Sequence, residues 1–301
     1  MPNVFTALQP VLYSAAQEVS AEPFGCVSAI STTFDDKGVA LGDSVKVPVA
    51  PTRTPTDYTP AMTTTAGADA TASTVDVQIT ANKMVDWHLT GEQLRSLENG
   101  STDGEWVRQL IAQGMRALRN LAEIDCATAI KQGASRVVGT AGTSPFASNL
   151  DVLSDARKVL RDNGAPMADM QFVMNTTAAN SLHKLGIYQQ ANIAGSDSER
   201  RSGQFLPQFG FTMRDSAGVG THTKGTGTSY VTSGSTAARV RDIALVTGSG
   251  TVLAGDVVTF AADSTNKYVI NTGIAAPGTI TLGRPGALVT IATANAMTIG
   301  N

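Results

Sequence analysis

Apolar residues at helical spacing between residues 103 and 132 constrain this sequence more than any other feature. Large apolar side chains recur there at steps of three, four or seven residues, at Val107, Ile111, Leu118 and Leu121. Most charged side chains lie between these positions. Such a stripe is typical of a helix with one buried face. A helix of this length would extend for about 40 to 45 Å, whereas an average helix has about 11 residues. We therefore expect a fold built around one long spine helix.

Both ends of this helix carry recognisable signals. Thr102 followed by Glu105 has the capping-box spacing that satisfies free amides at a helix start, and Gly133 is a typical stop residue. Thr90 followed by Gln93 repeats the capping-box pattern and predicts a shorter helix just ahead of the long one.

Two earlier segments alternate apolar and polar residues and predict a hairpin. The first is Val45–Val49, the second is Ser73–Ile79, and a Thr-rich stretch with several prolines separates them. Pro48 lacks the amide hydrogen that a central strand needs, which predicts an edge strand. Because a long two-stranded hairpin buries little of its own surface, we expect a neighbouring subunit to cover it.

A mixed segment follows the long helix. Its pattern predicts a helix over 150–160, a short buried strand over 171–174, and a helix over 176–185 that is capped by one of its first two threonines. A polar, loop-like stretch comes next, and no further strand is predicted before Gly218.

After Gly218 the composition shifts to Gly, Thr, Ser and Val, with turn residues such as Pro277-Gly278 between apolar runs. The strand candidates in this part are residues 238–246, 257–260, 267–270, 279–282 and 287–292. Short strands at this spacing are typical of a small barrel or sandwich.

These patterns divide the chain into four parts with an α+β organisation. Residues 1–35 predict neither a helix nor a strand and are interpreted as an N-terminal arm that packs on something else. Residues 36–85 form an extended hairpin loop, residues 86–217 hold the long helix and the mixed segment, and residues 218–301 form a separate β-rich domain.

The composition excludes several classes of protein. A net charge of -3 with 16% charged residues fits neither a basic nucleic-acid binder nor an acidic disordered tail. No stretch reaches the roughly 18 to 20 consecutive apolar residues of a membrane span, so no membrane partner is expected. Residues 1–5 lack the features of a secretory signal, so export is not expected. Only 5% of the residues are aromatic, which favours a structural protein over an enzyme.

The reactive side chains predict neither a metal nor a cofactor site. Cys26 and Cys126 have neither CxxC spacing nor a nearby histidine and are interpreted as buried thiols in a reducing compartment. His88, His183 and His222 lie far apart in sequence and are expected to face solvent or to bond locally.

One short motif is shared with serine acyl-transfer enzymes. Ser181 and Lys184 have the SxxK spacing in which a lysine activates a hydroxyl, but the accompanying SDN and KTG motifs are missing. A helix surface is the preferred interpretation. The glycines near positions 218 and 225 lack the GxxxxGK[ST] pattern of a phosphate loop, so no nucleotide is expected.

The order of these parts resembles the Hong Kong 97 fold of tailed-phage major capsid proteins, in which an N-terminal arm, an extended loop and a spine helix precede peripheral and axial domains. Residues 42–50 (GDSVKVPVA) and 255–260 (GDVVTF) are similar to short-tailed-phage coat proteins of the gene 5 type. Those proteins carry an inserted β-barrel domain, which would correspond to residues 218–301. Family members continue beyond the barrel with a segment that returns to the axial domain, whereas this sequence stops at Asn301.

The resemblance implies a major capsid protein that assembles from pentamers and hexamers into an icosahedral shell around double-stranded DNA. It also implies a scaffolding protein and a portal as partners, assembly in the host cytoplasm, and a final location in the virion. Neither a cofactor nor a catalytic residue is implied.

Five charged residues are candidates for contacts between subunits. Arg53, near the predicted hairpin tip, could pair across subunits with Asp103 or Glu105 at the start of the long helix. Arg200 and Arg201 form a basic pair that could contact a neighbouring subunit or packaged DNA, although a solvated loop is the simpler interpretation.

Three other interpretations remain open. A bacterial nanocompartment shell shares the fold but usually lacks the barrel. A β-rich binding module would need only the last domain. An enzyme would be built around Ser181 and Lys184.

Overall fold

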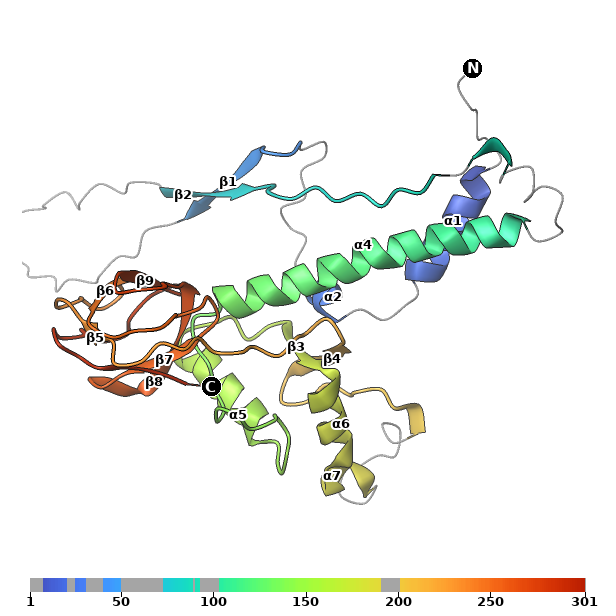
Figure 1. Ribbon diagram of the computed structural model, residues 1–301. Coiled ribbons are helices and arrows are strands. Elements are labelled where there is room, and N and C mark those ends of the chain that lie inside the picture. Colours follow the sequence, from blue (N-terminus) through green and yellow to red (C-terminus); the bar gives the residue numbers. More distant parts are fainter. Residues whose placement is uncertain are drawn as a thin grey trace, which may run out of the picture. The chain divides into compact units, whose positions relative to one another are not determined.

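The computed structural model describes residues 8–20, 25–30, 40–49, 73–88, 90–92, 103–190 and 201–300 (Figure 1). The chain forms two units, a hairpin unit of residues 31–94 and a main unit of residues 1–30 and 95–301. Helices and strands are both present, so the fold is α+β, as the sequence predicts. No helix in the described part of the chain combines the length and the apolar character needed to cross a membrane.

The hairpin unit contains the predicted antiparallel pair of strands. β1 (Ser44–Val49) pairs with β2 (Ser73–Gln78), and Val47 lies opposite Val75. Pro48 is tolerated in β1 because each strand of a two-stranded sheet is an edge strand. The predicted hairpin and the predicted edge position are both confirmed.

The main unit is built along α4 (Asp103–Gly133), which confirms the predicted spine helix and its stop residue. The helix has 31 residues and is therefore about 46 Å long. Its first half buries Ile111 and Ala112, whereas Leu118 is 37% exposed and Ile130 is 52% exposed. The second half of the stripe is thus only partly covered.

The N-terminal part corrects the sequence interpretation. α1 (Leu8–Ser20) is a regular helix, although residues 1–35 predict no helix. Its apolar side chains repeat every four residues (Val11, Ala15, Val19) and pack against α4 in a small core. The α1 part of the predicted N-terminal arm therefore packs against α4 of its own chain.

The part after α4 largely follows the prediction. It contains α5 (Asp151–Asp162), β3 (Met170–Asn175), α6 (Thr176–Lys184) and α7 (Gly186–Gln189). The cap of α6 differs from the prediction, because the side chain of Asn175, and not a threonine, accepts the Ala178 amide at 2.8 Å.

A strand that the sequence does not predict completes this part. β4 (Phe211–Ser216) runs parallel to β3, with Phe172 opposite Met213. Only two residues of β4 are apolar, which explains the weak sequence signal. The core around this pair includes Phe146, Leu153, Met174, Ala178, Leu182 and Phe211.

The last part is a six-stranded antiparallel sheet in the order β10-β7-β8-β9-β6-β5. Its strands are β5 (Val231–Thr232), β6 (Asp242–Val246), β7 (Val257–Phe260), β8 (Asp263–Thr272), β9 (Thr279–Leu282) and β10 (Met297–Ile299). A bridge between Val231 and Ala296, with a 2.9 Å bond from the Met297 amide to the Tyr230 carbonyl, joins the two outer strands. The sheet therefore curls into a near-barrel.

One predicted strand of the barrel is wrong. Residues 287–292 form no strand, and Ile291 makes only an isolated bridge with Thr236. Ile291 is nevertheless 0% exposed, so the apolar run reflects burial of an irregular segment in the barrel core. β5 and β10, which the sequence does not predict, are short strands of two and three residues.

The barrel is attached to the C-terminal end of α4. The Asn271 side chain donates to the Gln132 carbonyl at 3.3 Å. A Cβ atom at Gly283 would lie 2.2 Å from the Ala134 carbonyl oxygen, so only glycine permits this approach.

Candidate assembly surfaces

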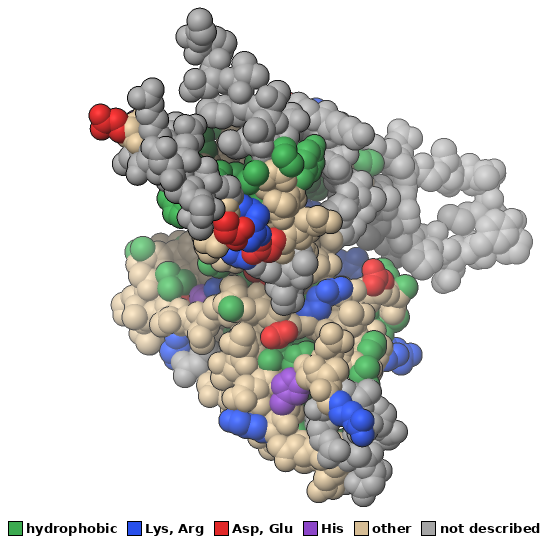
Figure 2. All heavy atoms as spheres, turned by 90° about the vertical axis from the view of Figure 1, so that its right-hand side faces the viewer, with side chains coloured by type: hydrophobic (Ala, Val, Ile, Leu, Met, Phe, Trp, Pro, Cys, Tyr) green, Lys and Arg blue, Asp and Glu red, His purple; other side chains and the backbone are tan. Residues whose placement is uncertain are grey.

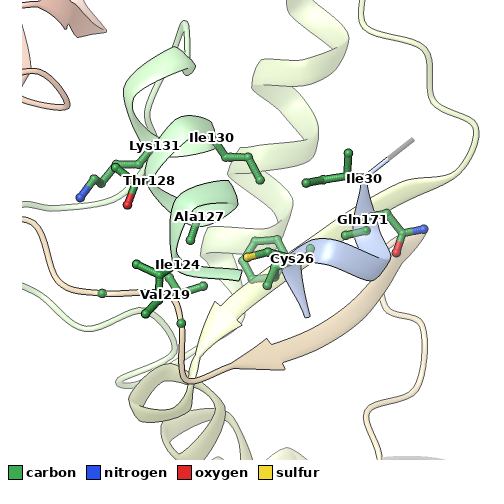
Figure 3. Close-up of a pocket in the computed structure, with 14 residues that line it drawn as sticks. Cys26, Ile30, Ile124, Ala127, Thr128, Ile130, Lys131, Gln171 and Val219 are labelled. Atoms are coloured by element: carbon green, nitrogen blue, oxygen red, sulfur yellow. The ribbon is translucent and has the colours of Figure 1, made fainter. Parts of the chain in front are cut away.

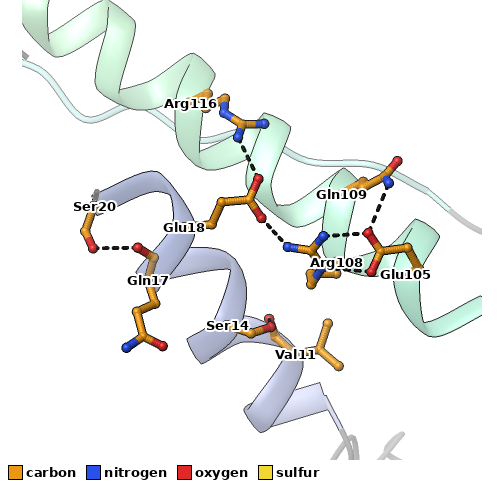
Figure 4. A network of polar contacts seen from close by, with 9 residues as sticks. All are labelled: Val11, Ser14, Gln17, Glu18, Ser20, Glu105, Arg108, Gln109 and Arg116. Atoms are coloured by element: carbon orange, nitrogen blue, oxygen red, sulfur yellow. Dashed lines mark hydrogen bonds and ion pairs between the residues drawn. The ribbon is translucent and has the colours of Figure 1, made fainter. Parts of the chain in front are cut away.

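A carboxylate of α1 is held between two arginines of α4 (Figure 4). Glu18 accepts a hydrogen bond from Arg116 Nη2 at 2.8 Å and another from Arg108 Nη1. Arg108 also bonds Glu105, and the same carboxylate accepts from the Gln109 side chain at 3.1 Å. This network connects the two helices outside their apolar contact.

These contacts favour the charged forms of both carboxyl groups. Hydrogen bonds from Arg116 and Arg108 lower the pKa of Glu18. The bond from Arg108, followed by that from Gln109, lowers the pKa of Glu105 to about 2. Glu105, a predicted contact between subunits, is therefore already paired within its own chain.

Large apolar side chains lie exposed on the same two helices. Tyr13 of α1 is 73% exposed, Leu12 is 43% exposed, and Trp106 of α4 is 42% exposed. Figure 2 shows acidic and basic side chains side by side at this end of α4, with hydrophobic side chains next to them. Apolar surface bordered by charge is typical of a protein contact site.

Replacement of Glu18 by glutamine should weaken the attachment of α1 only slightly, because the ion pairs are exposed. We expect the midpoint of thermal unfolding, followed by circular dichroism, to fall by about 2 °C. The difference should shrink in 0.5 M salt, which screens surface charges. Gln17→Ala on the same helix is the control. It should leave the midpoint of thermal unfolding unchanged, both with and without the added salt. A loss above about 5 °C that salt does not reduce would contradict this account.

A second carboxylate of α4 is buried and fixes another part of the N-terminal segment. Glu123 is 3% exposed and accepts the Cys26 amide at 2.6 Å and the Val27 amide at 2.8 Å. These amides open the short helix α2 (Cys26–Ala29), whose cap residue Gly25 has no side chain to offer. Glu123 therefore supplies the cap from a distant part of the chain.

Close packing surrounds this carboxylate. A Cβ atom at Gly25 would lie 2.8 Å from both the Asp215 carbonyl oxygen and the Ser216 Cβ. A Cβ atom at Gly218 would lie 2.7 Å from Glu123 Cγ. α2, α4 and the end of β4 thus meet at one point with no room for larger residues.

The charge of Glu123 is retained despite its burial. Burial alone would raise the pKa, but hydrogen bonds from Ser216 and from the amides at the start of α2 outweigh it, so the pKa is lowered. Burial, followed by this nearby anion, raises the pKa of Cys26 to about 11. The same two causes, with Asp125 as a third, raise the pKa of Cys126. Both thiols are free, and Cys26 is buried as predicted, whereas Cys126 is only half-buried.

A groove of about 530 Å³ lies beside this junction (Figure 3). Its walls come from α2, the second half of α4, β3 and the segment 218–220, and Lys131 is the one charged residue among those that line it. The isoleucines that line it are well exposed, with Ile30 at 41%, Ile124 at 49% and Ile130 at 52%. The groove is therefore a second apolar surface of the main unit.

The sheet of the hairpin unit is exposed on its polar face and only half-buried on the face that carries Val45, Val47 and Val75. From residue 74 to residue 88 every side chain is exposed except that of Val75, which is half-buried. The exposed apolar side chains include Val77, Ile79, Met84, Val85 and Trp87. The hairpin and the segment after it thus present several apolar side chains that the chain itself leaves exposed.

In the barrel, a buried aspartate organises two loops. Asp256 is 0% exposed and accepts the Leu253 amide at 2.7 Å and the Gly225 amide at 3.1 Å. His222 Nε2 lies 2.7 Å from the same carboxylate. Asp256 thereby ties the segment that leads into the barrel to the turn before β7.

The five predicted contact residues are spread over the chain. Arg53 and Arg200 lie outside the described residues. Asp103 and Glu105 share the first turn of α4, and Arg201 is exposed on a different segment. Contacts of these residues between subunits stay a prediction.

Ser181 of the SxxK motif and two of the three histidines have local contacts within the described residues, whereas His88 is exposed. Ser181 Oγ donates to the Thr177 carbonyl at 3.0 Å, so its proton is directed to the backbone and not to Lys184. The His183 ring stacks on Phe205 with 4.5 Å between ring centres. Among the residues that the structure describes, no three His, Cys, Asp or Glu side chains gather in a way that could hold a metal ion.

No sequence pattern points to Glu18, Glu123 or Asp256 as functional residues, although each of these carboxylates accepts hydrogen bonds from at least two groups. A signal exists for Glu18, because the apolar repeat of Val11, Ala15 and Val19 predicts a helix that carries it. Glu123 sits at a polar position of a strongly predicted helix, and its partners are about a hundred residues away. No local pattern reveals such a bond.

Comparisons with known proteins support a shared fold. Neither a family model nor a curated protein sequence matches this chain. Among solved structures, a chain from Mycobacterium phage Che8 matches with a TM-score of 0.50 and 16% sequence identity, over 86% of this chain and 79% of that chain. At this level of identity the match shows the fold alone. The fold of this chain is therefore shared with a protein from a bacteriophage.

Proposed function

We propose that this chain is the major capsid protein of a tailed bacteriophage, with the Hong Kong 97 fold and an added barrel of the gene 5 type. The order of its parts supports this proposal: an N-terminal helix, an exposed hairpin, a 31-residue helix, a mixed α/β part and a near-barrel. The fold shared with the Mycobacterium phage Che8 chain is consistent with it.

The exposed hairpin unit is the observation that carries the proposal. A stable monomer gains nothing from a two-stranded sheet that leaves Val77 52% exposed, or from the segment after it, in which Met84 is 81% exposed. Such a hairpin is useful when a neighbouring subunit covers it. In a shell each subunit has several neighbours, so contacts that are weak one at a time give a cooperative closed assembly.

The other parts then have mechanical roles. α4 acts as a beam that keeps the barrel, attached at its C-terminal end, at a fixed distance from α1 at its start. Pentamers and hexamers of the chain would enclose double-stranded DNA without sequence preference, and a net charge of -3 suits a shell that does not grip it. A scaffolding protein and a portal are the partners expected during assembly in the host cytoplasm, and the virion is the final location.

Electron microscopy of the negatively stained protein tests this function. We expect closed shells, tens of nanometres across, from the purified chain or after co-expression with the genes that neighbour its own. Shells that contain enzymes and no DNA would favour a nanocompartment instead. Monomers under both conditions would contradict the proposal and favour a β-rich binding module.

A further inference from the structure

The segment after β2, residues 80–88, lacks any partner in the described part of the chain. Every side chain in it is exposed, and none of its backbone groups makes a hydrogen bond with the residues that the structure describes. Met84 is 81% exposed, Trp87 43% and Val85 39%. Asp86 lies between these apolar residues and is the one acidic residue of the segment. Extended chain with this composition is typical of a segment that binds along another protein surface. The segment also contains Lys83, so the match to a partner concerns Asp86 and the apolar side chains around it and not the net charge.

A surface that offers both arginines and exposed apolar side chains lies in the barrel, where four arginines surround the turn 283–287. They are Arg136, Arg239, Arg241 and Arg284. We call this surface the arginine turn. Their convergence is fixed by hydrogen bonds: the Arg239 amide donates to Ala287 at 2.6 Å, Arg136 Nη2 to Gly286 at 3.0 Å, and Arg241 Nε to Leu282 at 3.0 Å.

Two of these arginines are available to a partner. The side chains of Arg239 and Arg284 are exposed and form neither an ion pair nor a hydrogen bond within the described residues. Exposed apolar side chains adjoin them, with Val240 at 41%, Leu288 at 39% and Val289 at 39%. The Arg239 amide and the Val240 carbonyl both bond Ala287, which places these apolar residues next to the two arginines.

We propose that the 80–88 segment of one copy binds the arginine turn of a second copy, with Asp86 between Arg239 and Arg284. The apolar side chains on either side of Asp86 would cover Val240 and Leu288, and the indole of Trp87 offers a face on which a guanidinium can stack. This contact deepens the proposed function and rests on it, because it names the surface that receives part of the hairpin unit in the shell.

A second copy fits this surface better than DNA does. The phosphate groups of DNA would bind the arginines but leave the apolar side chains exposed. The exposed Val240, Leu288 and Val289 are better covered by a partner that has apolar side chains of its own. Because donor segment and receiving surface occupy different parts of one chain, one copy can donate its segment to a second copy and receive that of a third, which is a head-to-tail arrangement. Repeated head-to-tail contacts produce a ring when the rotation between copies closes on itself.

Charge exchange across the contact tests the proposal. The wild type, an Arg239→Glu/Arg284→Glu variant, an Asp86→Arg variant and the combined triple variant are compared for the fraction of protein in shells, by sedimentation and electron microscopy. We expect each partial variant to lose at least about tenfold of the assembled fraction, and the triple variant to recover it to within about twofold of wild type. Arg161→Glu on α5, the same reversal at one exposed arginine elsewhere in the chain, should assemble normally.

The outcomes separate the proposal from the proposed function. If the wild type forms no shells, the capsid function fails. If the wild type forms shells but the triple variant is not rescued, or the arginine variant assembles normally, the contact is overturned. Arginine variants that form normal shells with less DNA would overturn it in favour of a nucleic-acid surface. Circular dichroism shows whether the charge-reversed variants are folded. If they are not, the neutral variant Arg239→Gln/Arg284→Gln/Asp86→Asn is used in their place, and it must still reduce the assembled fraction.

A crosslink decides whether the contact joins two copies. Met84→Cys combined with Leu288→Cys should give dimers and larger ladders on a non-reducing gel, after an added oxidant such as a copper–phenanthroline complex has taken up the two electrons released when the two thiols form a disulfide in the assembled protein. Each single cysteine variant controls for the two native thiols. A crosslink confined to the monomer band, or none at all in shells, would overturn the proposal.

Discussion

Replacement of Asp256 by alanine should unfold the barrel at a much lower denaturant concentration than wild type. The change leaves the Leu253 and Gly225 amides and the His222 ring without their buried acceptor. Each buried donor left without a partner costs about 1 to 3 kcal/mol, so we expect a total loss of about 3 to 5 kcal/mol in the free energy of unfolding. Urea unfolding followed by circular dichroism measures it.

Two variants make this prediction specific. Asp256→Asn keeps the shape but turns an NH₂ group toward one of the donors, so its loss should be smaller, about 2 kcal/mol. Asp242→Ala removes an exposed aspartate of the same barrel, whose side chain accepts a hydrogen bond from Thr281 and from no other described residue, and should cost under about 1 kcal/mol. If Asp256→Ala were no worse than Asp242→Ala, the buried carboxylate would not organise the two loops.

The second large effect is expected at Glu123. Glu123→Ala should cost about 3 kcal/mol in the free energy of unfolding, because the Cys26 and Val27 amides at the start of α2 lose their cap in a buried position. Asp125→Asn, an exposed change on the same helix, is the control and should cost under about 0.5 kcal/mol.

The contribution of Glu123 should also depend on pH. Its pKa is lowered in the folded chain, so the unfolded chain binds the proton more readily. The stabilisation is therefore complete above the ordinary pKa of a glutamate and is lost as the pH falls through the lowered value. The difference in stability between wild type and Glu123→Gln should be constant from pH 8 to about 6 and shrink below about pH 4. A difference that grows toward low pH would contradict the assignment.

The parts of the fold that the sequence predicts well are those with long local patterns. The stripe on α4 and its stop at Gly133 give both bounds of that helix to within one residue. The alternation in β1 and β2 likewise gives the hairpin, because burial on one side of a pleated strand repeats every two residues. Neither pattern needs knowledge of what the element packs against.

The missed features depend on distant partners. β4 has only two apolar residues and exists because β3 offers a parallel neighbour. Residues 287–292 read as a strand because they are apolar, but they fill the barrel core without pairing along their length. The carboxylate contacts have the same cause: Glu18 and Glu123 acquire their partners only when the N-terminal segment returns to α4.

The closure of the barrel has a kinetic consequence. Val231 and Ala296, which join its outer strands, are about 65 residues apart in sequence, and the pairs β6–β9 and β10–β7 also join strands that do not follow one another along the chain. High contact order slows folding, whereas the local hydrogen bonds of a long helix form within microseconds. During synthesis α4 would therefore fold well before the barrel closes. There is therefore an interval in which α4 is folded and the barrel is still open. In that interval the unpaired strands are exposed and accessible to a chaperone.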